Sequence, residues 1–277
     1  MEIASPQPTG ALTAGPEPAF GQRWNGWAVF LIFLTVLFLF YVIQLIVTIV
    51  LIYSQFAHVI ADYISRADQA GLAKFFTSPE GLARIFSPLN LLLIQIFSGG
   101  SLVGLTLLFG RVLGASARDF GLAIPARWKP ILIGVGGGLA LWLLSILVEA
   151  AQEKIFGPHP QAIIKVFAFH HGALAFTFDI VAVAVIAPIA EELFFRGMLF
   201  TALVQRMSLP WAATISGFVF GLSHIEPWNI VPLSILGIGL AYVYYRTRTI
   251  WANICAHAAI NAISLTLAFF APQFGGS

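Results

Sequence analysis

The sequence predicts an all-α fold, a polytopic membrane bundle of about seven transmembrane helices, with six to eight as the range. Three observations predict it. Of the 277 residues, 59% are hydrophobic and only 9% are charged, whereas soluble domains average about 25% charged residues. The apolar residues gather in blocks of about the 20 residues that a spanning helix needs. Polar stretches and prolines separate these blocks, which sets the expected helix boundaries.

The first apolar block, 26–53, exceeds the roughly 7–15 residues of a secretory signal core, so we expect it to remain as an anchor. Residues 54–87 mix charged and apolar side chains, which suggests a loop with an amphipathic interfacial helix. A basic stretch at 111–129 separates the second block from the third. The expected spans are 26–53, 88–110, 130–150, 175–205, 209–226, 228–245 and 250–271.

The chain divides into four parts by composition. Residues 1–22 are rich in Pro, Gly and Ala and are expected to form a flexible tail. An N-terminal transmembrane region with the interfacial segment, 23–124, precedes a transmembrane domain, 125–271, that carries the candidate site. A short tail, 272–277, follows. In the second domain Gly134 and Gly138 have the spacing that lets two helices pack closely, and we assign them no chemistry.

Charge limits the function classes. The net charge of +2 is small and scattered, so no nucleic-acid partner is expected. Cys255, the single cysteine, excludes an intramolecular disulfide framework. With the N-terminus in the cytoplasm, eight arginines and lysines fall inside and five outside, which favours that orientation. We expect an integral multi-pass membrane protein, located in the plasma (inner) membrane if the source is bacterial.

The stretch "APIAEELFFRGML", 187–199, places three ionisable residues in an apolar span. Each such group costs about 2.5–3.5 kcal/mol at a helix centre, so its default interpretation is functional. Glu192 and Arg196 stand four residues apart on one helical face, which predicts an ion pair. Glu191 points about 100° away from Glu192 and is left as a free carboxylate. Such a group is suited to acid–base chemistry or to metal binding.

Two further apolar segments carry histidines, His224 and His257. Asn253, His257 and Asn261 recur every four residues and form one polar stripe, continued by Ser264, that should face protein or water. A single buried histidine is more often a hydrogen-bonded core residue than a catalyst, and asparagines commonly join helices. Three such features in three spans nevertheless predict an active site. The remaining histidines are assigned to solvated surface loops: His58, His159, His170 and His171.

These residues form three motifs, "EELFFR" at 191–196, "FGLSH" at 220–224 and "HAAIN" at 257–261. In order and spacing they resemble the CAAX-protease and bacteriocin-processing (CPBP, or Abi) family of intramembrane proteases, which includes the type II CAAX prenyl endopeptidases. The resemblance extends over about 125–270, and the first 120 residues show no mark of the family. It implies peptide hydrolysis without a covalent enzyme intermediate.

Carried over to this chain, the resemblance implies that Glu191 and His224 activate a water molecule. It implies that His257 and Asn261 stabilise the oxyanion of the tetrahedral intermediate, with Glu192 and Arg196 in support. Glu191, His224 and His257 also have the ligand types of a three-ligand zinc site. No His-Glu-x-x-His helix is present, however, and we favour catalysis without a divalent metal. No other cofactor is expected.

Two other function classes stay open. A secondary transporter or proton relay would also place Glu and His in spans, and a non-catalytic membrane chaperone or assembly factor is compatible with the family. The expected partners are the lipid bilayer and a membrane-associated peptide or protein. The sequence does not choose among a prenylated tail, a leader peptide and a membrane anchor as substrate.

Overall fold

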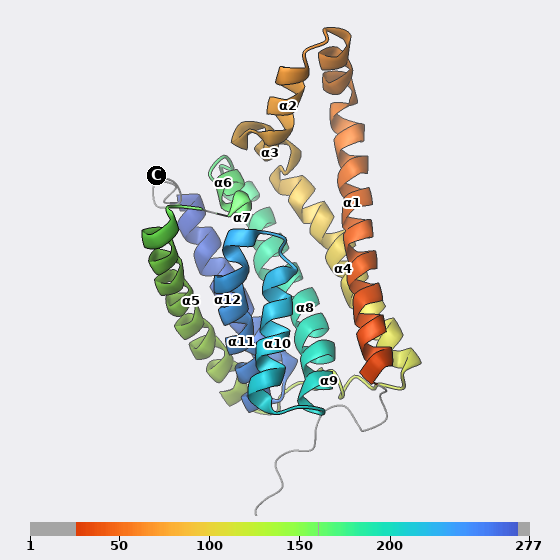
Figure 1. Ribbon diagram of the computed structural model, residues 1–277, viewed down its shortest axis with the longest axis vertical. Coiled ribbons are helices and arrows are strands. Elements are labelled where there is room, and N and C mark those ends of the chain that lie inside the picture. The colour runs from red at the N-terminus through yellow and green to blue at the C-terminus, as the bar shows by residue number, and fades with distance from the viewer. Residues whose placement is uncertain (1–25, 160, 271–277) are drawn as a thin grey trace, which may run out of the picture.

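The computed structural model describes residues 26–159 and 161–270, and within them every regular element is a helix, as predicted (Figure 1). The predicted tails, 1–22 and 272–277, lie outside the described residues. Within the described residues, six helices are long and apolar enough to cross a membrane, so the chain is an integral multi-pass membrane protein. They are α1 (Gly26–Ser65), α4 (Pro88–Val112), α5 (Lys129–Phe156), the continuous helix Ala173–Val204, the segment Pro227–Thr247 and α12 (Ile250–Phe270).

The seventh expected span, 209–226, is shorter than predicted. It forms α10 (Leu209–Leu222), whose 14 residues reach about 21 Å, less than the roughly 30 Å hydrocarbon core of a bilayer. The short 3-10 helix η3 (Pro227–Asn229) then leads into α11 (Ile230–Thr247). His224 therefore lies just beyond the end of a short helix and not inside a span.

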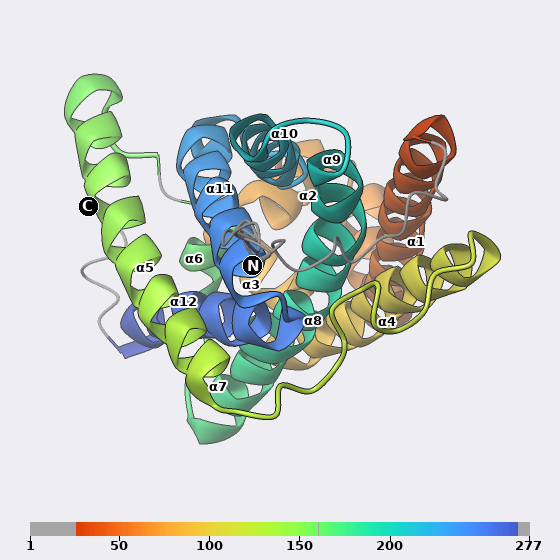
Figure 2. The same cartoon turned by 90° about the horizontal axis from the view of Figure 1, so that it is seen from below.

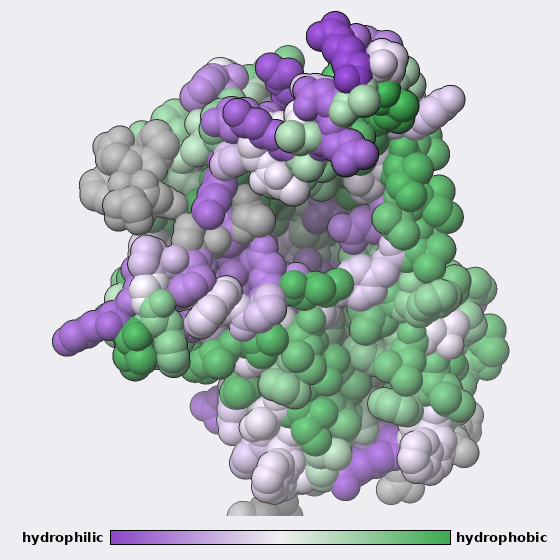
Figure 3. All heavy atoms as spheres, turned by 45° about the horizontal axis from the view of Figure 1, so that its top comes forward, coloured by the Kyte–Doolittle hydropathy of each residue, from purple (hydrophilic) through white to green (hydrophobic). Residues whose placement is uncertain are grey.

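The first helix is longer than predicted. The segment 54–87, expected as a loop with an interfacial helix, instead continues α1 to Ser65 because 54–65 contains no glycine or proline. Its 40 residues span about 60 Å. Two short helices follow, α2 (Gln69–Thr77) and α3 (Pro79–Ile85). The end of α1, with α2 and α3, projects beyond the other helices (Figure 1), and hydrophilic residues gather there (Figure 3).

Side-chain caps set where these short helices begin. The Asp68 carboxylate accepts a hydrogen bond from the backbone N–H of Gly71 at 2.8 Å. Ser78 accepts one from the Gly81 N–H at 3.1 Å, and a proline follows it at the first helical position. Both arrangements satisfy N–H groups that have no partner within the helix.

The helices pack in pairs: α1 lies on α4, α5 on α12, and α10 on α11 (Figures 1 and 2). The contact between α5 and α12 depends on glycine. A Cβ atom at Gly134 would lie 2.1 Å from the carbonyl oxygen of Ala252, and one at Gly138 would lie 2.5 Å from that of Ala256. No larger residue fits, so the close packing predicted for this glycine pair is confirmed.

The helix Ala173–Val204 contains two π-helical segments. Its parts are α7 (Ala173–Ile180), η1 (Val181–Ile186), α8 (Ala187–Glu192), η2 (Leu193–Phe200) and α9 (Thr201–Val204). The π segments η1 and η2 therefore stand on either side of α8, which ends with the two glutamates. Every residue of η2 is buried, which places this helix in the core of the bundle.

Pro188 explains how η1 is stabilised by a neighbouring helix. The Ala187 N–H donates to the carbonyl of Ala182, five residues earlier. In the same register Pro188 would donate to Val183, but proline has no N–H. The Asn261 side chain on α12 donates to the Val183 carbonyl instead, with Nδ2 at 2.8 Å. A side chain of another helix thus satisfies the carbonyl that the proline leaves free.

Candidate active site

The predicted ion pair of α8 and η2 is present and fully buried. Arg196 Nη1 donates to Glu192 Oε1 at 3.0 Å, and both side chains are 0% exposed. The second guanidinium nitrogen, Nη2, donates to the Gly237 carbonyl on α11 at 3.0 Å. Because a buried charge needs a partner, Glu192 and Arg196 hold each other and tie α8 to α11.

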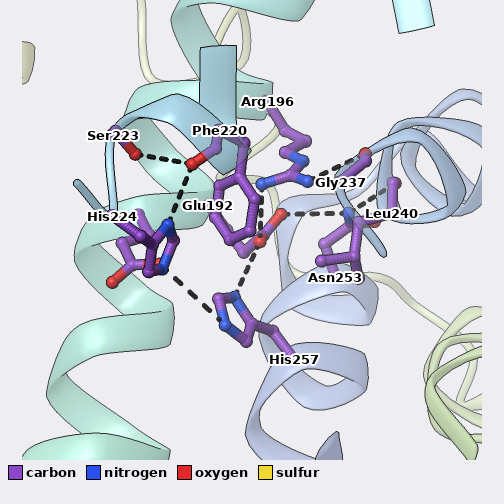
Figure 4. Close-up of polar contacts among 10 residues, drawn as sticks. Glu192, Arg196, Phe220, Ser223, His224, Gly237, Leu240, Asn253 and His257 are labelled. Atoms are coloured by element: carbon purple, nitrogen blue, oxygen red, sulfur yellow. Dashed lines mark hydrogen bonds and ion pairs between the residues drawn. The ribbon is translucent and has the colours of Figure 1, made fainter. Parts of the chain in front are cut away.

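Glu192 does more than neutralise the arginine. Its Oε1 also lies 2.9 Å from Nδ1 of His257, and its Oε2 accepts a hydrogen bond from Asn253 Nδ2 at 3.1 Å. Since a carboxylate oxygen accepts, the imidazole Nδ1 carries the hydrogen, and the Nε2 atom of His257 points away from Glu192. The buried carboxylate therefore fixes the orientation of the histidine (Figure 4).

Glu191 has a different environment from its neighbour. Its side chain is 23% exposed, and its Oε2 lies 3.9 Å from Nε2 of His257, which is beyond hydrogen-bond distance. It lines a cavity of about 560 Å³. The prediction that Glu191 is separate from the Glu192–Arg196 pair is confirmed by this geometry.

His224 reaches the same cavity from the end of α10. Its Nδ1 lies 2.9 Å from the carbonyl oxygen of Phe220, and because a carbonyl only accepts, Nδ1 carries the hydrogen. In the neutral ring Nε2 then keeps its lone pair. No described residue bonds to this Nε2 atom, so it is available to a water molecule or a substrate.

The Phe220 ring lies among His224, His257 and Arg196 (Figure 4). The centre of its ring is 4.8 Å from the His224 ring, 5.8 Å from the His257 ring and 4.7 Å from the guanidinium carbon of Arg196. Sequence reasoning recorded this phenylalanine only as part of a motif. Its ring sets the spacing of the two histidines and covers one face of the buried arginine.

The predicted polar stripe of α12 faces protein along its length. Asn253 and His257 contact Glu192, while Ser264 accepts a hydrogen bond from Trp142 Nε1 on α5 at 3.2 Å. Asn261 contacts η1 through its bond to the Val183 carbonyl and does not line the cavity. The structure thus brings Glu191, His224 and His257 together. It gives the Asn261 amide a backbone partner, and its oxyanion role stays a prediction.

The predicted exposure of His170 is wrong. His170, expected on a solvated loop, is only 4% exposed. Its Nδ1 lies 2.8 Å from Oδ2 of Asp179 on α7, which is 0% exposed. The loop before α7 folds inward because the Asp179 carboxylate needs a polar partner in an apolar environment. His171 is exposed as predicted. His58 is exposed but lies within α1 and not in a loop. His159, also predicted to be solvated, is half-buried against Trp228, with ring centres 3.7 Å apart.

The N-terminal helices contribute residues that the sequence analysis did not identify. The Tyr41 hydroxyl on α1 donates a hydrogen bond to the carbonyl of Ser223, the residue before His224. Tyr41 also lines the cavity together with Gln44. The signal that could have identified them is a run of polar residues at helical spacing, Tyr41, Gln44 and Thr48, in an otherwise apolar block.

The donors of the candidate zinc site are not arranged for a metal ion. Among the described residues, no group of three or more His, Cys, Asp or Glu side chains is placed to hold one. Glu191, His224 and His257 have suitable ligand atoms, and the Nδ1 bonds of the two histidines leave each Nε2 atom free, but the three side chains do not form such a group. We therefore derive no step through a metal.

Comparison with known proteins relates part of the chain to a family. Residues 173–263 match the family model described as type II CAAX prenyl endopeptidase Rce1-like. The chain is 28% identical over 128 residues to the "Putative membrane peptidase YdiL" of Bacillus subtilis (strain 168), a segment that covers 46% of this chain and 47% of that protein.

A second relative is the "UPF0177 protein YaiF" of Lactococcus lactis subsp. lactis (strain IL1403), 32% identical over 92 residues. That segment covers 33% of this chain and 41% of the relative. The chain thus spans about half the length, or less, of the curated relatives it matches. No solved structure matches the chain. The predicted resemblance is confirmed: residues 173–263, which contain all three motifs, match the type II CAAX prenyl endopeptidase Rce1-like family model.

Proposed function

We propose that the chain is an intramembrane endopeptidase that hydrolyses a peptide bond in a membrane-associated substrate. One observation carries the proposal: of two adjacent glutamates, Glu192 is fully buried and bonded on both oxygens, whereas Glu191 faces the cavity. A partly exposed carboxylate beside two histidines has the geometry of a general base. The family match and the membrane peptidase relative support the same reaction.

In the proposed reaction the Glu191 carboxylate accepts a proton from a water molecule that also hydrogen-bonds to Nε2 of His224. The water oxygen bonds to the carbonyl carbon of the scissile peptide and forms a tetrahedral oxyanion. Protonated at Nε2, His257 donates to this oxyanion, while Glu192 holds its other nitrogen. The proton on Glu191 then passes to the leaving amine as the C–N bond breaks.

The cavity supports a substrate that carries a lipid or an apolar segment. Most of its lining is apolar, from α1, α3, α4 and the short helix α6 (Ala162–Phe167), and it lies beside helices long enough to span a membrane. A peptide that carries a lipid or an apolar segment would bury that part against these walls. A prenylated C-terminal peptide is the first probe to use because of the family description, followed by a leader peptide and a membrane anchor.

The test is cleavage by purified protein in lipid nanodiscs of three quenched fluorescent peptides: a farnesylated C-terminal peptide, an unmodified leader peptide and a transmembrane segment. We expect Glu191→Gln and His224→Ala to lower turnover by a factor of about 10²–10⁴ with unchanged thermal unfolding. The matched controls are Glu80→Gln and His171→Ala, both at exposed positions. Full activity in both site variants would show that the site is wrong.

We also propose that the reaction needs no metal, since among the described residues no group of three donors is placed to hold one. Protein stripped with a chelator should keep its turnover. Loss of turnover that only added zinc restores would overturn this part of the proposal and leave the peptidase assignment intact.

A further inference from the structure

The cavity wall contains polar side chains that the proposed reaction does not use. Three of them come from the N-terminal helices: Tyr41 and Gln44 from α1, and Gln95 from α4. The other polar lining residues outside the proposed machinery, Ser223 and Glu226, each make a hydrogen bond within their own segment, to Phe220 and from Asn229 respectively. The N-terminal three are the polar groups that face the cavity from outside the matched family segment, 173–263.

The two glutamines have hydrogen-bonding capacity that the described residues leave unused. Tyr41 is satisfied because its hydroxyl donates to the Ser223 carbonyl. The Gln44 side chain makes no hydrogen bond with any described residue, and Gln95 accepts only one long contact, from Ser98 Oγ at 3.4 Å. The Gln95 amide nitrogen donates to no described residue. Each carboxamide therefore presents donors, and an acceptor with spare capacity, to the cavity.

The same two helices show what a structural amide contact looks like. Gln55 on α1 and Asn90 on α4 bond reciprocally: Gln55 Nε2 donates to Asn90 Oδ1 at 2.8 Å, and Asn90 Nδ2 donates to Gln55 Oε1 at 3.1 Å. Neither residue lines the cavity. Amides that join α1 to α4 thus satisfy each other, whereas Gln44 and Gln95 do not. A polar group left unsatisfied in an apolar, membrane-embedded environment is costly unless a ligand satisfies it.

We propose that Gln44 and Gln95 bind the main chain of an extended substrate segment and guide it past Glu191. This inference rests on the proposed peptidase function and adds a subsite to it. A carboxamide offers one N–H and one C=O side by side, which matches the N–H and C=O of a peptide group whatever its side chain. Recognition of this kind selects an extended backbone and leaves the sequence of the substrate free.

The helical register predicts the spacing of the two contacts. Counted from the Gln55–Asn90 contact, Gln44 lies 11 residues along α1, about 16 Å, and Gln95 lies five residues along α4, about 8 Å. Both runs lead in the same direction, because α1 and α4 are antiparallel (Figure 1). The difference of about 8–9 Å corresponds to two or three residues of an extended peptide, at roughly 3.3 Å per residue.

The experiment measures binding, so it does not require cleavage. The probe is a fluorescein-labelled, farnesylated peptide that ends in a Cys-aliphatic-aliphatic-Met sequence, with each backbone amide N-methylated in turn. Its affinity is measured by fluorescence anisotropy with Glu191→Gln protein in nanodiscs. We expect one N-methyl position to weaken binding about three- to tenfold, the size of one hydrogen bond. That penalty should vanish in the Glu191→Gln/Gln44→Leu protein.

Gln95→Leu should remove the penalty at a second position, two or three residues from the first. The matched control is Gln55→Leu, which changes an amide on the same helix but should keep every N-methyl penalty while lowering the unfolding temperature. The subsite would be overturned if the N-methyl penalties at every position were the same in the Glu191→Gln protein and after Gln44→Leu or Gln95→Leu is added. A probe that does not bind at all would also overturn it. Binding with these couplings but without cleavage by wild-type protein would instead refute the peptidase function.

Discussion

Two buried histidine–carboxylate pairs can be compared within this chain. In one, His170 Nδ1 lies 2.8 Å from Oδ2 of Asp179, and in the other, His257 Nδ1 lies 2.9 Å from Oε1 of Glu192. All four residues are at most 4% exposed. By residue type, burial and distance the pairs are nearly equivalent, yet only one of them belongs to the candidate active site.

The difference lies in what the remaining atoms of each pair face. Glu192 is also bonded by Arg196 and Asn253, and Nε2 of His257 points toward Glu191. At the other pair, the remaining nitrogen of His170 and the remaining oxygen of Asp179 have no hydrogen-bond partner among the described residues. A buried histidine–carboxylate hydrogen bond thus serves to join two segments of the chain. Catalysis also requires that the second nitrogen of the histidine face a group that can contact the substrate.

The largest expected effect is on the stability of the pair at the site. Glu192→Leu leaves Arg196 buried without its carboxylate, so the free energy of unfolding should fall by about 3–5 kcal/mol. The double variant Glu192→Leu/Arg196→Met should recover most of this loss and remain inactive, because His257 is no longer oriented. Thermal unfolding in detergent measures both. A double variant no more stable than the single one would contradict the role of the buried arginine.

The next effect separates the two histidines by function. His257→Gln should lower turnover of the cleaved peptide by a factor of about 10²–10³, as expected when one donor to an oxyanion is lost. His170→Gln should leave turnover within about twofold of wild type, since its side chain contacts Asp179 and Phe167 and not the residues of the candidate site; a change of about twofold corresponds to less than 0.5 kcal/mol. Steady-state kinetics on matched amounts of folded protein decide this. Equal losses in both variants would remove the distinction drawn between the pairs.

A smaller effect is expected on the stability of the second pair. Asp179→Ala leaves Nδ1 of His170 buried without an acceptor, which should lower the free energy of unfolding by about 1–3 kcal/mol. Adding His170→Leu should restore part of that loss, because both polar groups are then removed together. The measurement is denaturant unfolding of the single and double variants. If Asp179→Ala is as stable as wild type, the His170–Asp179 hydrogen bond does not stabilise the loop before α7.

The smallest effect concerns the hydrogen bond that links α1 to the end of α10, beside the candidate active site. Tyr41→Phe removes the hydrogen bond to the Ser223 carbonyl and should cost about 0.5–1.5 kcal/mol of stability. Tyr53→Phe is the matched control on the same helix, at a side chain 73% exposed. A turnover that falls for Tyr41→Phe but not for Tyr53→Phe would confirm that α1 positions the end of α10. Identical stability and turnover in both variants would show that the contact carries no function.

The comparison also shows which features could be predicted from the sequence. The ion pair of Glu192 and Arg196 follows from spacing within one helix, and so does the inward-facing stripe of α12. The burial of His170 could not be predicted, because its partner Asp179 lies in the following helix and loop composition alone suggested solvent. The contact of His257 with Glu192 joins residues 65 positions apart, which helical periodicity does not report.

The fold was predicted in its class but not in its boundaries. Apolar blocks predict helices and membrane insertion, since both depend on local composition. The extent of α1 was missed because its charged residues suggested a loop, although 54–65 contains no glycine or proline, and the shortness of α10 depends on tertiary contacts, which composition does not encode. The π segments were missed for a similar reason: Pro188 was recognised as a break, but the Asn261 side chain that satisfies the Val183 carbonyl comes from another helix.

The π segments on either side of α8 make the site sensitive to chain length in a way that substitutions cannot reveal. A π turn arises when one extra residue is accommodated in an α-helix. Deleting one residue from η1 would let the segment return to α-helix and would turn all that follows by about 100° relative to α7. Glu192 would then point where Glu191 points now, and Glu191 would point where Ala190 points now. Every functional side chain would still be present. Homologues that gain or lose a single residue in 181–186 should therefore differ in which glutamate meets the cavity, and alignments across this helix should allow gaps there.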